Sequence, residues 1–108
     1  MIRELRHYVR NDGLGEPLLV RFGDHVLPIL ADLGFRLSGL WTAADGSGEL
    51  WYVLDWADDV EMAEAWRRFA ADLRWISART HSEADVGKLT RSLISRLVTV
   101  PDFARSTL

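Results

Sequence analysis

The sequence predicts an α+β fold in which one antiparallel sheet carries its helices on a single face. Three observations support this prediction. Four segments have the composition and alternation of β-strands, two longer stretches repeat apolar residues every three or four positions, and turn-forming residues separate the segments. The predicted order is strand, helix, strand, strand, helix, short helix, strand. With short right-handed connections, this order gives the ferredoxin-like βαββαβ arrangement.

The first predicted strand covers residues 1–9 and places Glu4, Arg6 and Tyr8 on one face. The helix that follows within a few residues covers one side of this strand. We assign Leu5 and its alternate neighbours to the helix-covered side. The polar trio is therefore expected on the opposite face, where it lines a polar-floored pocket or meets a partner.

A helix is predicted over residues 17–33, with a bend at Pro28 because proline removes a backbone hydrogen bond. Strands are predicted at residues 35–42 and 49–56, joined by a hairpin rich in Gly, Asp and Ser. The apolar stripe of the helix is Leu18, Phe22, Val26, Ile29, Leu30 and Leu33.

A second helix begins after Asp58, which stands three residues before Glu61 as in a capping box. Its apolar stripe is Met62, Trp66, Phe69, Leu73 and Ile76. A polar break is predicted at residues 78–81, and Ser82 is expected to cap a short helix carrying Val86 and Leu89. The last strand is predicted at residues 93–100, ending at a proline.

Composition indicates one domain over residues 1–108 and excludes several classes of function. The net charge of −3 argues against nucleic acid or an anionic membrane surface as partner. The absence of Cys excludes disulfides and zinc–thiolate sites, and the three scattered His give no metal-ligand spacing. No apolar run reaches the length of a membrane span, and no leader is recognised, so the expected location is cytoplasmic.

Helices on one face leave the other face of the sheet bare. A bare sheet face that carries Trp and Tyr has a larger apolar area than the patches that soluble monomers usually expose. We therefore expect a homodimer in which two sheets cover one another, with space for a ligand.

Five groups of residues run in order over nearly the whole chain. They are Met1-Ile2-x-Glu4-Leu5-Arg6-x-Tyr8, His25-Val26-Leu27-Pro28-Ile29-Leu30, Gly34-x-x-Leu37-x-Gly39-x-Trp41-Thr42, Asp72-x-x-Trp75 and Leu97-x-x-x-Pro101-x-Phe103. Together they resemble the NIPSNAP family of the dimeric α+β barrel superfamily. The resemblance implies a ferredoxin-like subunit, a side-by-side dimer and a cavity between sheet and helices. It implies no single reaction, since bacterial relatives include cofactor-free monooxygenases, polyketide cyclases and haem enzymes. Val53 and Asp55 stand where the family often has a His and an aromatic residue.

The candidate catalytic residues are Glu4, Arg6, His25 and Asp55. Arg6 is suited to hold a carboxylate or enolate, and Glu4, with its pKa raised by burial, to act as base. The alternative is a structural ion pair between the two. His25 suits acid–base work near neutral pH, or is a satisfied helix residue. Asp55 either takes the place of the family His, paired with Arg6 or Arg96, or meets solvent at the strand end.

The candidate substrate-binding residues are Tyr8, Trp41 and Trp51. Tyr8 is suited to donate to a substrate oxygen, or packs its ring with one partner for its hydroxyl. Trp41 and Trp51 are candidates for a pocket or for a dimer interface.

We expect a small-molecule-binding protein that catalyses a cofactor-free cyclisation, isomerisation or oxygenation of an apolar, aromatic or polyketide-like metabolite. The alternative is a homodimeric binding or interaction module without catalysis. An enzyme requires Glu4, Arg6 and a His or Asp to converge on one ligand-sized space.

Overall fold

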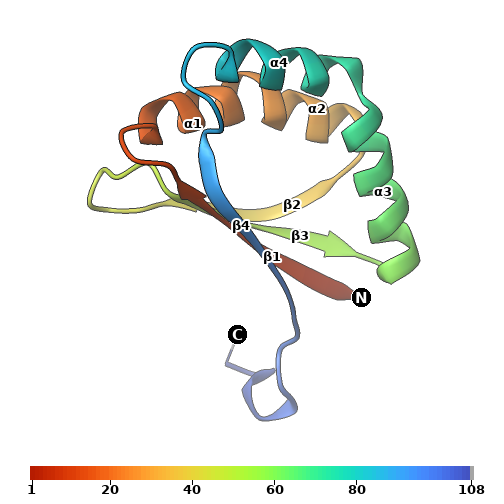
Figure 1. Cartoon of the computed structure of the whole chain (residues 1–108). Helices are drawn as coiled ribbons and strands as arrows, with labels where there is room; N and C mark the ends of the chain where they lie inside the picture. The colour runs from red at the N-terminus through yellow and green to blue at the C-terminus, as the bar shows by residue number, and fades with distance from the viewer. Residues whose placement is uncertain (108) are drawn as a thin grey trace.

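The computed structural model describes residues 1–107 and has the predicted α+β architecture. A four-stranded antiparallel sheet in the order β2-β3-β1-β4 has its main helices on one face (Figure 1). The strands are β1 (Ile2–Arg10), β2 (Arg36–Thr42), β3 (Leu50–Trp56) and β4 (Thr90–Val98). The helices are α1 (Gly15–Arg21), η1 (Phe22–Val26), α2 (Leu27–Asp32), α3 (Asp59–Ala71), α4 (Leu73–Glu83) and η2 (Asp102–Ala104). None of these helices is long and apolar enough to cross a membrane.

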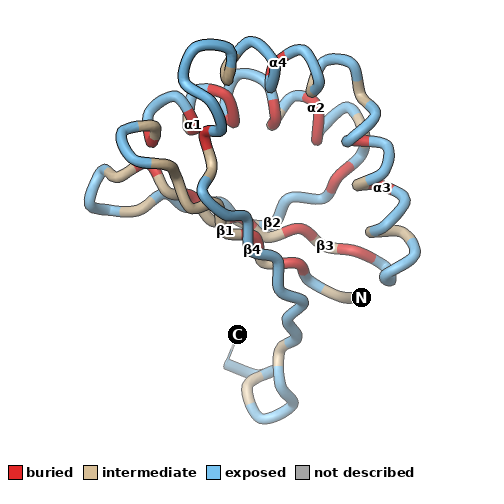
Figure 2. Tube along the Cα trace, viewed as in Figure 1, coloured by how far each residue is buried: buried red, intermediate tan, exposed pale blue. Residues whose placement is uncertain are grey.

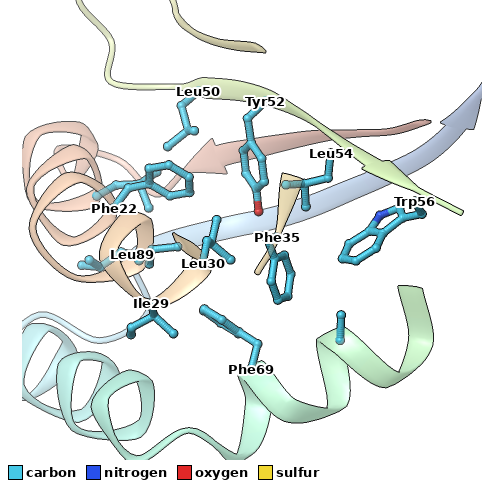
Figure 3. Packing of buried hydrophobic residues seen from close by; sticks show 13 residues of the cluster. Phe22, Ile29, Leu30, Phe35, Leu50, Tyr52, Leu54, Trp56, Phe69 and Leu89 are labelled. Atoms are coloured by element: carbon cyan, nitrogen blue, oxygen red, sulfur yellow. The ribbon is translucent and has the colours of Figure 1, made fainter. Parts of the chain in front are cut away.

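The core lies between β1, β3 and the helices, and the apolar stripe predicted for the first helix is its centre. Figure 2 shows buried residues along β3 and on the helix sides that face the sheet, whereas β4 is exposed beyond its first residue. Figure 3 shows Tyr52, Leu54 and Trp56 projecting from β3 toward Phe35 and Phe69. The buried apolar cluster comprises Leu18, Phe22, Val26, Ile29, Leu30, Phe35, Leu50, Tyr52, Leu54, Trp56, Ala65, Phe69 and Leu89.

The first helix is interrupted ahead of Pro28, the residue at which a bend was expected. A π-helical turn, η1, connects α1 to α2, and Pro28 lies in the first turn of α2. Helical hydrogen bonding continues up to this point, since the amide of Leu27 donates to the carbonyl of Phe22, and Pro28, which has no amide hydrogen, follows directly after the π-helical turn.

The second half of the chain differs from the prediction. Asp58 caps α3 as expected, since its carboxylate accepts from the amide of Glu61 at 2.8 Å. The helix then stops at Asp72, whose side chain accepts from the amide of Arg74 at 2.9 Å and caps α4. The polar break at residues 78–81 and the short helix after Ser82 were wrong, because this second cap starts α4, which runs through the break and ends at Glu83. Val86 and Leu89 lie in the turn and loop that follow α4.

The assignment of the two faces of β1 was also wrong. The register pairs Glu4 with Leu54, Arg6 with Tyr52 and Tyr8 with Leu50, so the polar trio lies on the helix-covered face. The opposite face, here called the bare face, presents residues from all four strands. They are Arg3, Leu5, His7, Val9, Trp41, Trp51, Val53, Asp55, Ile94, Arg96 and Val98.

Candidate functional site

A cavity of about 340 Å³ lies between the helix-covered face of the sheet and the helices. Its size is that of a site for a small organic molecule. The wall is mainly apolar and aromatic, and the sheet contributes Arg6 and Tyr8. The lining residues are Arg6, Tyr8, Leu18, Arg21, Phe22, Val26, Trp66, Phe69, Ala70, Trp75, Arg79, Glu83, Lys88, Thr90 and Leu93.

Glu4 lies beside this cavity, and both of its carboxylate oxygens are fully engaged. Oε1 accepts from the indole nitrogens of Trp66 at 2.8 Å and Trp56 at 3.0 Å. Oε2 accepts from Ser95 Oγ at 2.7 Å and Arg6 Nη1 at 2.8 Å. These four donors come from β1, β3, α3 and β4, so the carboxylate connects the sheet to a helix.

The surroundings of Glu4 keep it ionised. Burial by itself raises the pKa of this carboxyl, but the hydrogen bonds from Ser95, Trp66 and Arg6 outweigh it and hold the pKa below its ordinary value. Glu4 does not line the cavity. The expected raised pKa was wrong, and the structure makes Glu4 the partner that positions Arg6.

Arg6 is held in place on three sides and remains open on one. Its Nη1 donates to Glu4, its Nε donates to the hydroxyl of Tyr52 at 2.9 Å, and its guanidinium lies 4.0 Å from the ring centroid of Trp66. Burial opposes its charge, but interaction with Tyr52, Tyr8 and Glu4 raises the pKa of Arg6 above its ordinary value. Its hydrogen bonds to Glu4 and Tyr52 occupy Nη1 and Nε, which leaves Nη2 for the neighbouring hydroxyl of Tyr8 or for a ligand in the cavity.

The hydroxyl of Tyr8 lies 2.6 Å from that of Tyr52. Burial raises the pKa of Tyr52 well above its ordinary value, so this side chain stays a neutral phenol. Either hydroxyl can donate to the other, and Tyr8 is the acceptor when Tyr52, which already accepts from Arg6, is the donor. The hydroxyl proton of Tyr8, which lines the cavity, is then available to a ligand. Arg6 and Tyr8 thus present two donors to the same space.

Arg21 and Glu83 form a second ion pair at the cavity. Arg21 is buried, and its Nη1 donates to Glu83 Oε2 at 2.8 Å and to Ser82 Oγ at 3.1 Å. Its guanidinium lies 5.0 Å from the ring centroid of Trp75. Glu83 is the carboxylate among the described lining residues, and the described residues offer no hydrogen bond to its Oε1.

The structure does not bring His25 or Asp55 to this cavity, so the expected convergence with Arg6 was wrong. His25 is exposed and lines a separate surface pocket together with Arg74 and His81. Asp55 lies on the bare face, where its Oδ1 accepts from Arg3 Nε at 3.0 Å. Its partner is therefore neither Arg6 nor Arg96.

Trp41 and Trp51 also lie on the bare face rather than in the cavity. They are register partners on β2 and β3, and the side chain of Trp41 is 56% exposed. The ring of His7 stacks on Trp51 with a centroid distance of 4.4 Å. These two indoles do not line the cavity, so the pocket role does not fit them. Their place on the bare face fits the alternative role at an interface.

Sequence reasoning missed much of the cavity wall. Trp66 was assigned to the core and Trp75 was noted only as part of a motif, and neither Arg21 nor Glu83 was considered. A signal for Arg21 existed, since it directly precedes Phe22 in the apolar stripe and lies one helical turn after Leu18. The pairing of Arg21 with Glu83 joins residues 62 positions apart, and no local pattern carries that information.

The sequence pattern that defines the NIPSNAP family matches residues 3–104 of the chain. The chain belongs to the NIPSNAP family. Solved NIPSNAP structures share its fold over almost the full length. One is an uncharacterized NIPSNAP domain protein from Burkholderia xenovorans, 23% identical, with 95% of this chain and 97% of that chain covered and a TM-score of 0.75. Another is a NIPSNAP family protein from Agrobacterium tumefaciens str. C58, 24% identical, with 94% of each chain covered and a TM-score of 0.76.

A more distant neighbour of this NIPSNAP chain is a structure described as an antibiotic biosynthesis monooxygenase. It is 14% identical, with 94% of this chain and all 100% of that chain covered, and its TM-score is 0.62. This likeness shows a shared fold alone. No curated protein is similar enough to match the chain.

Proposed function

We propose that the cavity binds a small apolar or aromatic molecule through an oxygen that accepts from Arg6 and Tyr8. One observation supports this most strongly. The buried network of Glu4, Arg6, Tyr52 and Tyr8 holds two donors at the floor of a cavity whose wall is mainly apolar and aromatic. Pre-oriented donors in a water-poor site stabilise a developing negative charge without reorganising.

The proposed chemistry is a cofactor-free, proton-transfer-driven reaction on an enolisable substrate. Loss of a proton from a carbon next to a carbonyl moves the electron pair onto the carbonyl oxygen. Arg6 and Tyr8 stabilise that oxyanion, and Glu83, with one free oxygen at the cavity, accepts the proton. Such an enolate leads to cyclisation, isomerisation or reaction with dioxygen. The distant likeness to an antibiotic biosynthesis monooxygenase is consistent with this proposal but supports it only through the fold.

Native mass spectrometry of the protein purified from its own host tests this proposal. We expect a small molecule retained at one copy per subunit, present in wild type and in His25→Ala, and depleted in Tyr8→Phe. Tyr8→Phe removes one hydroxyl at the cavity, and His25→Ala is the control outside it. Equal retention in both variants contradicts the assigned site. So does a wild-type protein that retains nothing and binds no apolar ligand in solution.

Catalysis is tested on the retained molecule itself. Incubation with the enzyme freed of ligand should convert it, and Glu83→Gln should slow the conversion more than it weakens binding, because a base acts in the reaction step. Unchanged turnover in Glu83→Gln contradicts its role as proton acceptor. Binding without turnover in the wild type leaves the protein a binding module.

The bare face supports a second proposal, a homodimer that acts as a binding or interaction module. Trp41 is 56% exposed, Val98 38% and Ile94 37%, and half-buried Leu5 and Val53 lie among them. Exposed apolar side chains on one face of a sheet, with charged residues such as Arg3, Asp55 and Arg96 among them, are characteristic of an interface. In dimeric α+β barrel proteins a second subunit covers such a surface, and the shared fold therefore adds support.

A further inference from the structure

The charged residues that line the cavity are unevenly balanced. Arg6 is neutralised by Glu4, and Arg21 is neutralised by Glu83. Arg79 and Lys88 also line the cavity, and within residues 1–107 neither side chain forms an ion pair. Both are exposed, which places them at the opening of the cavity, whereas Arg6 is buried at its floor. The opening therefore carries two positive charges that form no ion pair within the described residues, beside the paired Arg21 and Glu83.

We infer that the ligand is an organic acid with two different ends, an inference that rests on the proposed function. Its uncharged carbonyl or phenolic oxygen lies at the floor on Arg6 and Tyr8. Its apolar body lies against aromatic side chains such as Trp66 and Trp75. Its carboxylate lies at the opening, where Arg79 and Lys88 supply charge.

Charge complementarity distinguishes the two ends. At the floor, Arg6 already pairs with Glu4, so a permanent carboxylate gains less there than at the opening, whereas a neutral ligand oxygen needs only the two donors until charge develops on it in the reaction. At the opening, a carboxylate meets two unpaired cations and remains partly hydrated, so its desolvation costs little. The chain as a whole carries a net charge of −3, so this local positive region is not a consequence of a basic protein.

The test compares 6-hydroxy-2-naphthoic acid with its carboxamide, two ligands of nearly the same shape that differ in charge at one end. Dissociation constants are measured by isothermal titration calorimetry at low salt. We expect wild type to bind the acid about tenfold more tightly, as for a charge-assisted hydrogen bond. The double variant Arg79→Gln/Lys88→Gln should bind acid and amide equally while keeping its affinity for the amide. The control Arg67→Gln/Arg68→Gln removes the same charge from α3, outside the cavity, and should retain the preference.

The outcomes separate this inference from the proposed function. Equal binding of acid and amide by the wild type overturns the inference, while the cavity remains a ligand site. A preference for the acid that survives in Arg79→Gln/Lys88→Gln also overturns the inference, because other residues then recognise the ligand carboxylate. A second matched pair is octanoic acid and octanamide. A wild type that binds neither the naphthoic acid nor its carboxamide, and neither compound of the second pair, overturns both proposals. A preference lost only in the cavity variant supports the inference.

Discussion

Replacing Glu4 with Gln tests whether the buried carboxylate organises the site. Gln keeps an oxygen that can accept from the indoles of Trp56 and Trp66. It loses the negative charge that pairs with Arg6, and its amide group faces the donors of Arg6 and Ser95. The substitution therefore leaves a buried guanidinium without its counter-ion at nearly constant side-chain volume.

The expected cost follows from the burial of the pair. The side chains of Glu4 and Arg6 are 2% and 11% exposed, so solvent screens their interaction weakly. Removing one partner of a buried ion pair costs about 3–5 kcal/mol. Arg6 keeps its hydrogen bond to Tyr52 and its contact with Trp66, so we expect a value near the lower end, about 3 kcal/mol. With an m-value of about 1.5 kcal/mol per molar urea, the unfolding midpoint falls by about 2 M.

Urea unfolding followed by Trp fluorescence and far-UV circular dichroism, at one protein concentration, measures this change. Glu64→Gln is the matched control, because Glu64 pairs with Arg67 on the exposed side of α3, and its midpoint should stay at that of wild type. A fall of less than about 0.5 M in Glu4→Gln would refute the reasoning, since the carboxylate would then contribute little more than an exposed one.

Three further predictions follow from other features. The pKa of Glu4 is below its ordinary value in the folded protein, so the stability it provides is complete above about pH 4.5 and is lost as pH falls through the folded pKa. The free energy of unfolding of Glu4→Gln should accordingly depend less on acidic pH than that of wild type. If the two proteins lose stability in parallel as pH falls, this prediction is contradicted. A Cβ at Gly15 would overlap the carbonyl oxygen of Ser47, so Gly15→Ala should lower the free energy of unfolding by about 1–3 kcal/mol, whereas Gly23→Ala, with open space around it, should not lower it. Trp41→Lys should convert the proposed homodimer to monomers in size-exclusion chromatography with light scattering, and a wild type that is monomeric at micromolar concentration contradicts the proposal.

Much of the fold could be predicted because its signals are local. The stripe that contains Leu18, Phe22 and Val26 repeats within one helix, and all three residues are buried in the structure. The hairpin between β2 and β3 and the cap at Asp58 likewise depend on neighbouring residues. The break at Asp72 was missed because an apolar stripe continues across it, and only the cap geometry divides the stripe into two helices.

The candidate site could be predicted only in part. Arg6 and Tyr8 were identified because polar side chains in a strand require partners, and both do line the cavity. His25 and Asp55 were placed with them on chemical suitability alone, and the structure separates them from the cavity. Arg79 and Lys88 are at the opening only because α4 and the loop before β4 meet there, which neither segment indicates by itself.

The sequence by itself determined the order of the elements and the family, since both depend on patterns along the chain. Alternation divided the side chains of β1 between two faces but did not say which face is inside, because the pattern is the same whichever face is buried. The tertiary structure decided this through the partners of Glu4, whose indole and hydroxyl donors stand 52, 62 and 91 residues away. A carboxylate can be buried only where such donors converge, and their convergence is a property of the packed chain.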